Sequence, residues 1–252
     1  INKYINKKLT RNIVNHVDII TLREQASKME LQKLYIDKPQ IIVTADPAFT
    51  IKPCKDTEVN RIFDKEEIIA KGPYIGFSVR KWDGYKKYIG VIAKAADYVY
   101  DKFGATPVFI PMQYPNDLII IKSIISKMKC KGYIIKNKYD MSQVMGITSK
   151  LDMLIGMRLH ALISAVSQNI PVVGLVYQPK VEWLLDYIDQ SHASAGDVKS
   201  LEIENLKEII DNVWENRETI KEHFETVTSN LKNKSIENAQ IAVSLLKSDN
   251  RD

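Results

Sequence analysis

Short apolar runs alternate with longer amphipathic segments along most of the chain. From residue 74 onward, the apolar runs predict strands at 74–79, 106–110, 132–135, 152–156 and 172–177. Helical spacing of apolar residues predicts helices at about 85–103, 115–129, 140–150 and 159–169. Strands that alternate with helices are typical of a parallel sheet covered by helices. Right-handed crossovers then produce an α/β, Rossmann-like domain.

The two flanks of this region carry further elements. On the N-terminal side we expect a helix at 1–14, a strand at 17–21, a helix ending at 34, a strand at 41–44 and a linker at 50–72. On the C-terminal side we expect a helix at 179–189 and then two helices between 200 and 247, broken near 229–235. We therefore divide the chain into residues 1–60, a Rossmann-like domain at 72–195 and C-terminal helices at 199–250.

Composition narrows the class of protein. The 252 residues carry a net charge of +5 with 45% apolar residues, as in an ordinary globular protein. Lys and Arg form no basic block, so we expect no nucleic-acid partner. Cys54 and Cys130 are far apart and the four histidines lack metal-ligand spacing, which predicts a reducing, cytoplasmic location and no metal. No apolar run approaches the ~20 residues needed to cross a bilayer, so we expect at most peripheral membrane contact.

The segment Gly-Met-Arg-Leu-His at 156–160 is the main candidate for chemistry. It lies between a predicted buried strand and a predicted helix, which places Arg158 and His160 at the carboxyl end of the strand. Ligands bind at such ends in open α/β sheets, and a helix N-terminus favours an anion there. Arg158 can bind a carboxylate or phosphate through two donors, and His160 can transfer a proton. An arginine at this position is also common as a purely structural residue.

Other polar residues occupy equivalent positions. Residues that follow predicted strands are Arg23, Asp46, Arg80, Gln113 and Lys180. Because a parallel sheet brings the carboxyl ends of its strands to one edge, these side chains are expected to converge. Taken singly, such an arginine is more often a surface ion-pair partner and Asp46 a turn residue. Together with Arg158 and His160, the set suits a substrate with two anionic groups that needs proton transfer.

Several motifs resemble one known family. The most specific one is DMLIGMRLHAL at 152–162, which is followed by IPVVG at 170–174 and YQPKV at 177–181. Earlier motifs in matching order are ITLRE at 20–24, TADPAF at 44–49, SVRKW at 78–82 and FIPMQ at 109–113 with Asp117. These segments resemble the polysaccharide pyruvyl transferases, and most of all the bacterial branch that modifies secondary cell-wall polysaccharide for cell-surface (S-layer) anchoring. The resemblance covers most of residues 17–190.

The resemblance implies a glycosyltransferase-B-like architecture of two Rossmann-like domains. Residues 1–60 would then be the remnant of a larger N-terminal domain. It implies that pyruvate passes from phosphoenolpyruvate to a sugar of a lipid-linked cell-wall precursor as a ketal, with release of phosphate and no cofactor. By matching positions, Arg23, Arg158 and Lys180 would bind the phosphate and carboxylate of phosphoenolpyruvate. His160 would serve as the general acid and base.

Two alternatives remain open on the sequence. A nucleotide-sugar glycosyltransferase of the same fold would bind a uridine nucleotide, although Gln178 and the lack of paired glutamates after His160 argue against it. No GxGxxG motif follows any predicted strand, so a dinucleotide site has no support. The second alternative is a non-enzymatic binding or scaffolding half.

Overall fold

The computed structural model describes residues 3–70 and 72–248, and the chain divides into two units. The first unit combines the residues up to Thr50 with those from Ser229 onward, and the second contains residues 51–228. The long helix α10 (Arg217–Ser248) begins in the second unit and ends in the first. The C-terminal helices are thus shared between the units.

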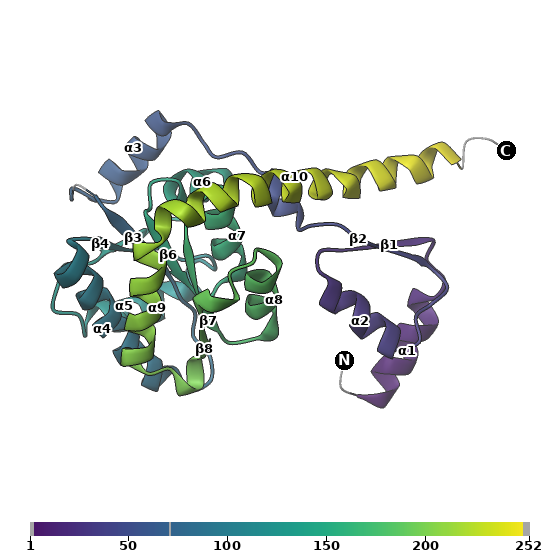
Figure 1. Ribbon diagram of the computed structural model, residues 1–252, viewed down its shortest axis with the longest axis horizontal. Coiled ribbons are helices and arrows are strands. Elements are labelled where there is room, and N and C mark those ends of the chain that lie inside the picture. The colour runs from purple at the N-terminus through teal and green to yellow at the C-terminus, as the bar shows by residue number, and fades with distance from the viewer. Residues whose placement is uncertain (1–2, 71, 249–252) are drawn as a thin grey trace. The chain divides into compact units, whose positions relative to one another are not determined.

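A six-stranded parallel sheet lies at the centre of the second unit (Figure 1). Its strands are β3 (Tyr74–Ser78), β4 (Thr106–Phe109), β5 (Tyr133–Ile134), β6 (Met153–Gly156), β7 (Val172–Val176) and β8 (Ser194–Asp197). They lie in the order β5-β4-β3-β6-β7-β8, which is the Rossmann order 3-2-1-4-5-6. The order reverses between β3 and β6, so a ligand crevice is expected beyond the carboxyl ends of these two strands. The predicted Rossmann-like α/β fold is confirmed.

Helices cover both faces of this sheet (Figure 1). On one side α4 (Tyr85–Phe103) contacts α5 (Asn116–Ile125) and α9 (Ile203–Glu215). On the other side α7 (Leu159–Ser167) contacts α6 (Met141–Thr148) and α8 (Pro179–Tyr187). Every residue of β6 and β7 is buried, as expected for continuous apolar strands between two helical layers.

The first unit holds a smaller parallel sheet. Its strands are β1 (Ile19–Leu22) and β2 (Gln40–Val43), and its other elements are α1 (Tyr4–Val14), α2 (Gln25–Lys33), the short η1 (Pro47–Thr50) and the end of α10. Asn238 of α10 accepts a hydrogen bond from Thr44 Oγ1 (2.8 Å) and donates one to the Ala45 carbonyl (3.0 Å). Ser235 donates to the Asp46 carbonyl at 3.1 Å. The last helix therefore holds the loop that follows β2.

The predicted linker at 50–72 is wrong. Residues 56–65 form helix α3 (Asp56–Lys65), which contacts α6 and buries Val59 and Ile62. These two residues lie three apart, so they share one face of the helix. The segment therefore belongs to the core of the second unit, and its charged residues lie on the outer face and at the C-terminal end of α3.

Two further expectations about the C-terminal region are corrected. The break between the last helices lies at Asn216, where the Asn216 side chain donates to the Asn212 carbonyl at 2.8 Å, and α10 continues through 229–235. Phe224, Thr228 and Leu231 are buried at helical spacing, which explains this continuity. Strand β8 was not predicted, because its sequence Ser-Ala-Gly-Asp contains no apolar run.

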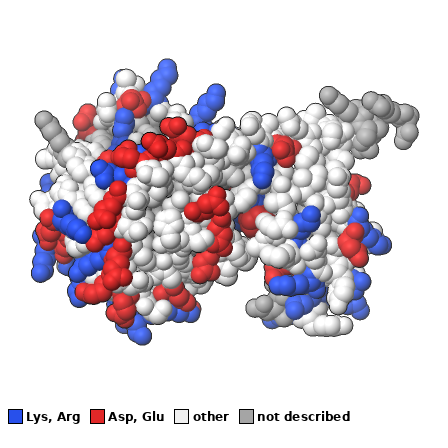
Figure 2. All heavy atoms as spheres, viewed as in Figure 1, with Lys and Arg blue, Asp and Glu red and all other residues white. Residues whose placement is uncertain are grey.

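Both signs of charge are mixed on the surface. Figure 2 shows acidic and basic side chains interspersed over the face of the second unit that it displays. In the described part of the chain, no helix is both long and apolar enough to cross a membrane.

A buried carboxylate joins α3 to the loop after β5. Glu66 follows α3 and is 2% exposed. It accepts hydrogen bonds from the backbone amides of Lys136 (2.6 Å) and Asn137 (3.1 Å), from Asn137 Nδ2 (2.8 Å) and from the Tyr139 hydroxyl (2.7 Å). Burial alone would raise the pKa of Glu66, but these donors outweigh it and the pKa falls below its ordinary value of 4.5.

The substitution Glu66→Gln should lower the free energy of unfolding at pH 7 by about 2 kcal/mol, because it removes charge-assisted hydrogen bonds. The folded-state pKa is lowered, so the stabilisation is complete above the ordinary value of 4.5 and disappears as the pH falls through the folded-state value. Urea unfolding should therefore show a difference from the wild type that narrows in acid. Glu67→Gln, at an exposed ion pair with Lys136, is the control and should leave the midpoint unchanged. A Glu66→Gln protein as stable as the wild type at pH 7 would contradict this account.

Candidate active site

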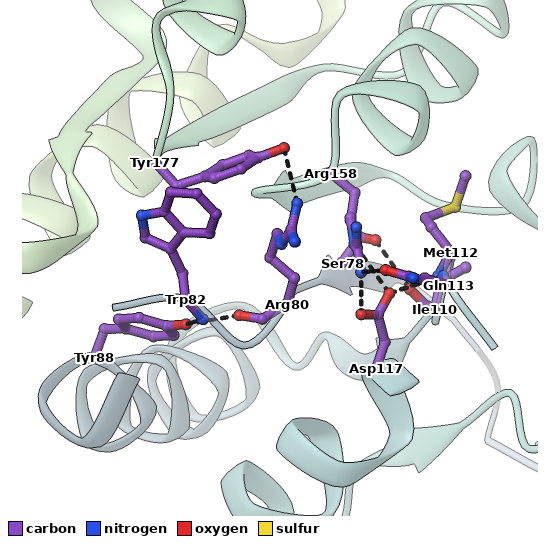
Figure 3. A network of polar contacts seen from close by, with 10 residues as sticks. All are labelled: Ser78, Arg80, Trp82, Tyr88, Ile110, Met112, Gln113, Asp117, Arg158 and Tyr177. Carbon is purple, nitrogen blue, oxygen red and sulfur yellow. Dashed lines mark hydrogen bonds and ion pairs between the residues drawn. The ribbon is translucent and has the colours of Figure 1, made fainter. Parts of the chain in front are cut away.

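Two arginines meet beyond the carboxyl ends of β3 and β6. These strands are neighbours, with Ser78 paired to Gly156, and Arg80 and Arg158 each follow their strand end by two residues. We call the edge of the sheet beyond the carboxyl ends of β3 and β6 the rim. Figure 3 shows both side chains there, with Arg158 directed toward Asp117 and Arg80 toward Tyr177. The rim coincides with the reversal of strand order, where a ligand is expected.

Arg158 is held by a carboxylate and an amide. It occupies the N-cap position of α7, and its Nε donates to Asp117 Oδ2 at 3.0 Å while Nη2 donates to Asp117 Oδ1. Nη2 also donates to Gln113 Oε1 at 3.0 Å. The Arg158 side chain is 14% exposed and that of Asp117 2%. This is a bidentate, largely desolvated ion pair, which is much stronger than an exposed one.

Asp117 also fixes the loop after β4. Its Oδ2 accepts the backbone amides of Met112 (3.1 Å) and Gln113 (2.9 Å), so one carboxylate ties this loop to Arg158. Arg158 is thus paired with a buried acid, and its binding of a substrate anion stays a prediction. Its charge is compensated by Asp117, and Nη1 is the nitrogen that has no hydrogen-bond partner in the described residues.

Arg80 has a different environment. Its guanidinium carbon lies 5.1 Å from the ring centroid of Trp82 and 5.0 Å from that of Tyr177, and Nη1 donates to the Tyr177 hydroxyl at 3.4 Å. Its Nε is buried and has no partner among residues 3–70 and 72–248. The loop is held by Tyr88, whose hydroxyl donates to the Arg80 carbonyl (2.6 Å) and accepts from the Trp82 amide (2.9 Å). Buried donors without a partner are rare in folded proteins, so the Nε of Arg80 is an exception to the usual pairing of buried polar groups.

Lys180 adds a second cation beside the same tyrosine. It lies in the first turn of α8, with its Nζ 5.0 Å from the centroid of the Tyr177 ring. Neither Lys180 nor Arg80 forms an ion pair with a carboxylate of the described chain. Burial alone would raise the pKa of the Tyr177 hydroxyl, but hydrogen bonding and charge from Lys180 and Arg80 lower it overall. Arg80, Lys180 and Tyr177, which we call the anion cradle, can thus bind a phosphate or carboxylate.

His160 lies in the first turn of α7, two residues after Arg158, and its side chain is exposed. The N-terminus of this helix favours negative charge nearby. The role of His160 in proton transfer stays a prediction.

Arg23 and Asp46 belong to the first unit, where they follow β1 and β2. Arg23 donates to Glu24 Oε2 at 2.8 Å and to Asp46 Oδ2 at 3.0 Å, and the Ala48 amide donates to Asp46 Oδ1 at 3.0 Å. Burial would lower the pKa of Arg23, but the two carboxylates raise it. The structure thus joins these two predicted residues in an ion pair. Their convergence with the residues of the second unit stays a prediction.

Sequence reasoning missed three residues that shape the rim. Asp117 was noted only as part of a motif, and neither Tyr88 nor Tyr177 was singled out. Tyr177 was the last residue of the strand predicted at 172–177, whereas the observed strand β7 ends one residue earlier, at Val176. Tyr88 had no recognisable sequence signal, since an aromatic residue inside an amphipathic helix is predicted to belong to the core. In the described residues no group of three or more His, Cys, Asp or Glu side chains is placed to hold a metal ion.

Comparison with known proteins shows both a family and a fold. A sequence model described as polysaccharide pyruvyl transferase matches residues 1–179. No curated protein matches the chain. Among solved structures, the chain is similar to a glycosyltransferase from Rickettsia africae ESF-5, with 16% identity and a TM-score of 0.64 over 97% of this chain and 68% of that one. It is also similar to HepE of Anabaena in complex with UDP, with 14% identity and a TM-score of 0.65 over 96% and 68% of the two chains.

A third similar structure is the UDP-GlcNAc 2-epimerase of Neisseria meningitidis bound to UDP-GlcNAc. Here the identity is 16% and the TM-score 0.67, over 98% of this chain and 65% of the other. This chain thus spans 65 to 68% of the length of these three structures. At such identities the likeness concerns the fold alone, which is that of glycosyltransferase-B-like enzymes.

Replacing the acid of the central ion pair should be strongly destabilising. Asp117→Asn leaves the Arg158 charge buried without its counter-charge, and we expect a loss of about 3 kcal/mol in unfolding free energy, measured with urea. Asp56→Asn is the control, because its carboxylate is exposed and pairs with Lys150 at the surface. An equal, small effect of both substitutions would show that the pair contributes little.

The tyrosine of the anion cradle should make anion binding sensitive to alkaline pH. As the pH rises through the lowered pKa of Tyr177, its phenolate competes for the charges of Arg80 and Lys180. Calorimetric titration with inorganic phosphate should therefore show affinity falling between neutral and alkaline pH. Tyr177→Phe should retain that affinity to higher pH, and a profile identical to that of the wild type would exclude this role.

Proposed function

The chain belongs to the polysaccharide pyruvyl transferase family, and from this premise we propose that it transfers pyruvate from phosphoenolpyruvate to a sugar. The product is a ketal that bridges two hydroxyls of one sugar in a cell-wall polysaccharide precursor, and inorganic phosphate is released. The reaction needs no cofactor beyond the donor itself. As in the cell-surface-anchoring branch, the acceptor is a lipid-linked saccharide at the cytoplasmic side of the membrane, with at most peripheral contact of the protein with the lipid.

The anion cradle is the observation that carries this proposal. Phosphoenolpyruvate carries a phosphate and a carboxylate on the same carbon, C2. Arg80 and Lys180 are two cations beside one tyrosine without acidic partners in the described chain. Charge-assisted hydrogen bonds to such groups are about twice as strong as neutral ones. Arg158 adds its Nη1 at the same rim. Donor binding by Arg23 is proposed on the matching motif position alone.

The chemistry requires a proton donor beside these cations. Protonation of the donor's methylene carbon makes its C2 an oxocarbenium-like centre, which a sugar hydroxyl attacks. The C2–O bond to phosphate then breaks, and a second hydroxyl closes the ketal, so one hydroxyl proton ends on the new methyl group and the other on phosphate. His160 is the proposed general acid and base, with a contribution of about 10²–10⁴ in rate. Arg80 and Lys180 stabilise the departing phosphate.

The alternative is a nucleotide-sugar glycosyltransferase. Its support is the likeness of fold to HepE and to the epimerase, whose structures contain uridine nucleotides. The family match favours pyruvyl transfer. Titration of the chain with UDP-GlcNAc and with phosphoenolpyruvate separates the two, and tight binding of the nucleotide sugar alone would favour the alternative.

Phosphate release from phosphoenolpyruvate, with and without a lipid-linked saccharide acceptor, is the direct test. Arg80→Ala should raise the KM for phosphoenolpyruvate about 10- to 100-fold, because one charge-assisted contact is lost. His160→Ala should mainly lower kcat, by about 10²–10⁴-fold. Arg158→Ala should weaken donor binding as well as turnover.

Arg61→Ala is the matched control for these variants, because Arg61 is an exposed arginine of α3. It should leave both kinetic constants unchanged. Acceptor-dependent phosphate release that persists at full rate in both Arg80→Ala and His160→Ala would refute the assigned roles, and its absence with every acceptor would refute the proposed reaction.

A further inference from the structure

A cavity of about 260 Å³ lies beside the rim, beyond the carboxyl ends of β4 and β5. The loop after β4, the loop after β5 and the start of α6 form its walls. It is lined by Met112, Gln113, Tyr114, Asn137, Lys138 and Tyr139, with further apolar residues at its base. All of these elements belong to the second unit.

Its polar groups have hydrogen-bonding capacity left over. Gln113 uses Oε1 to accept from Arg158, and its Nε2 has no partner in the described chain. Asn137 uses Nδ2 to donate to Glu66, and its Oδ1 accepts from no described residue. Lys138 is exposed and forms no ion pair within residues 3–70 and 72–248. The cavity therefore offers an amide donor, an amide oxygen and an ammonium group.

The walls also offer aromatic and apolar surface. Tyr114 and Tyr139 contribute rings, and Met112 and Met141 contribute flexible side chains that adapt to an irregular outline. A pyranose ring has the matching chemistry, with an apolar C–H face that packs on aromatic rings and a rim of hydroxyls that exchange hydrogen bonds with amides. The cavity volume admits a single ring of this size. It is smaller than the roughly 300–1,000 Å³ of sites for larger ligands.

One wall is held in place before a ligand arrives. Glu66 binds the loop after β5 through the amides of Lys136 and Asn137 and the hydroxyl of Tyr139. Such fixing reduces the entropy lost on binding. Gln113 joins the other wall directly to Arg158, so a ring in this cavity lies next to the arginine pair of the rim.

We propose that this cavity binds one pyranose ring of the acceptor saccharide. This inference rests on the proposed function, because the role as acceptor subsite presupposes a saccharide acceptor. Gln113, Asn137 and Lys138 hold the hydroxyls of the ring, and Tyr114 or Tyr139 packs on its apolar face. Glu66 is a positioning residue that acts through the loop after β5.

Binding is measured first, without turnover. Saturation-transfer NMR on the full chain uses methyl pyranosides of glucose, galactose and mannose, their N-acetylated forms and, separately, uridine as probes. We expect saturation of the ring protons of at least one pyranoside. Met141→Trp fills the cavity and should weaken that binding at least tenfold, whereas Ile119→Trp, at a site 67% exposed on α5, should leave it unchanged.

A second pair of variants guards against misfolding of Met141→Trp. Lys138→Ala removes an exposed side chain and should weaken pyranoside binding severalfold, while Lys122→Ala, at an exposed position of α5, should not. Absence of binding by every pyranoside, binding of uridine in their place, or pyranoside binding unaffected by both cavity variants would each overturn the proposal.

Kinetics separate this inference from the proposed reaction. With the acceptor varied, Lys138→Ala should raise the acceptor KM and leave the KM for phosphoenolpyruvate unchanged. Phosphate release with an acceptor KM that neither cavity variant alters would refute the subsite and leave the reaction standing. Pyranoside binding that depends on the cavity, without phosphate release from phosphoenolpyruvate, would refute the reaction alone.

Discussion

The ion pair between Asp117 and Arg158 determines the geometry of the rim. Asp117 is contributed by the first turn of α5 and Arg158 by the start of α7, so their contact ties together the loops that follow β4 and β6. The same carboxylate also accepts the amides of Met112 and Gln113. Since both side chains are largely withdrawn from water, neither charge is tolerable without the other. One electrostatic contact consequently holds the loop after β4 against the loop after β6.

Glu66 has a comparable role at the next strand of the sheet. It is a nearly inaccessible carboxylate that collects backbone amides of the loop after β5, as Asp117 does for the loop after β4. In both cases the acid comes from a helix or its end and stabilises a strand-end loop that has no regular hydrogen bonding of its own. A carboxylate that accepts several hydrogen bonds offsets the cost of burying its charge, and the same hydrogen bonds fix the backbone of the loop. Adjacent loops of the sheet are thus held by the same kind of contact.

The sequence predicted helices and strands correctly where the apolar residues follow a single clear pattern. The apolar runs of β6 and β7 and the helix α7 between them were predictable, because strands buried on both faces have continuous apolar sequences. The helix at Asp56–Lys65 was hidden by its charge, although Val59 and Ile62 already stood at helical spacing. The partner of Arg158 could not be read at all, since Asp117 lies 41 positions away and only the strand order brings the two together. Sequence therefore located the rim but could not tell which of its cations was already paired.

That distinction matters for any reaction that must release an anion. Asp117 compensates Arg158, whereas Arg80 and Lys180 keep their charges beside Tyr177. Uncompensated cations attract free phosphate as well as a phosphorylated donor, so a more positive rim would slow the release of the phosphate product. In a site with one compensated arginine, that arginine orients the bound anion, and the other cations attract it only moderately. Within the proposed function, Arg158 orients the donor and the anion cradle supplies the attraction, so the two arginines differ in role because only one of them has a buried acid.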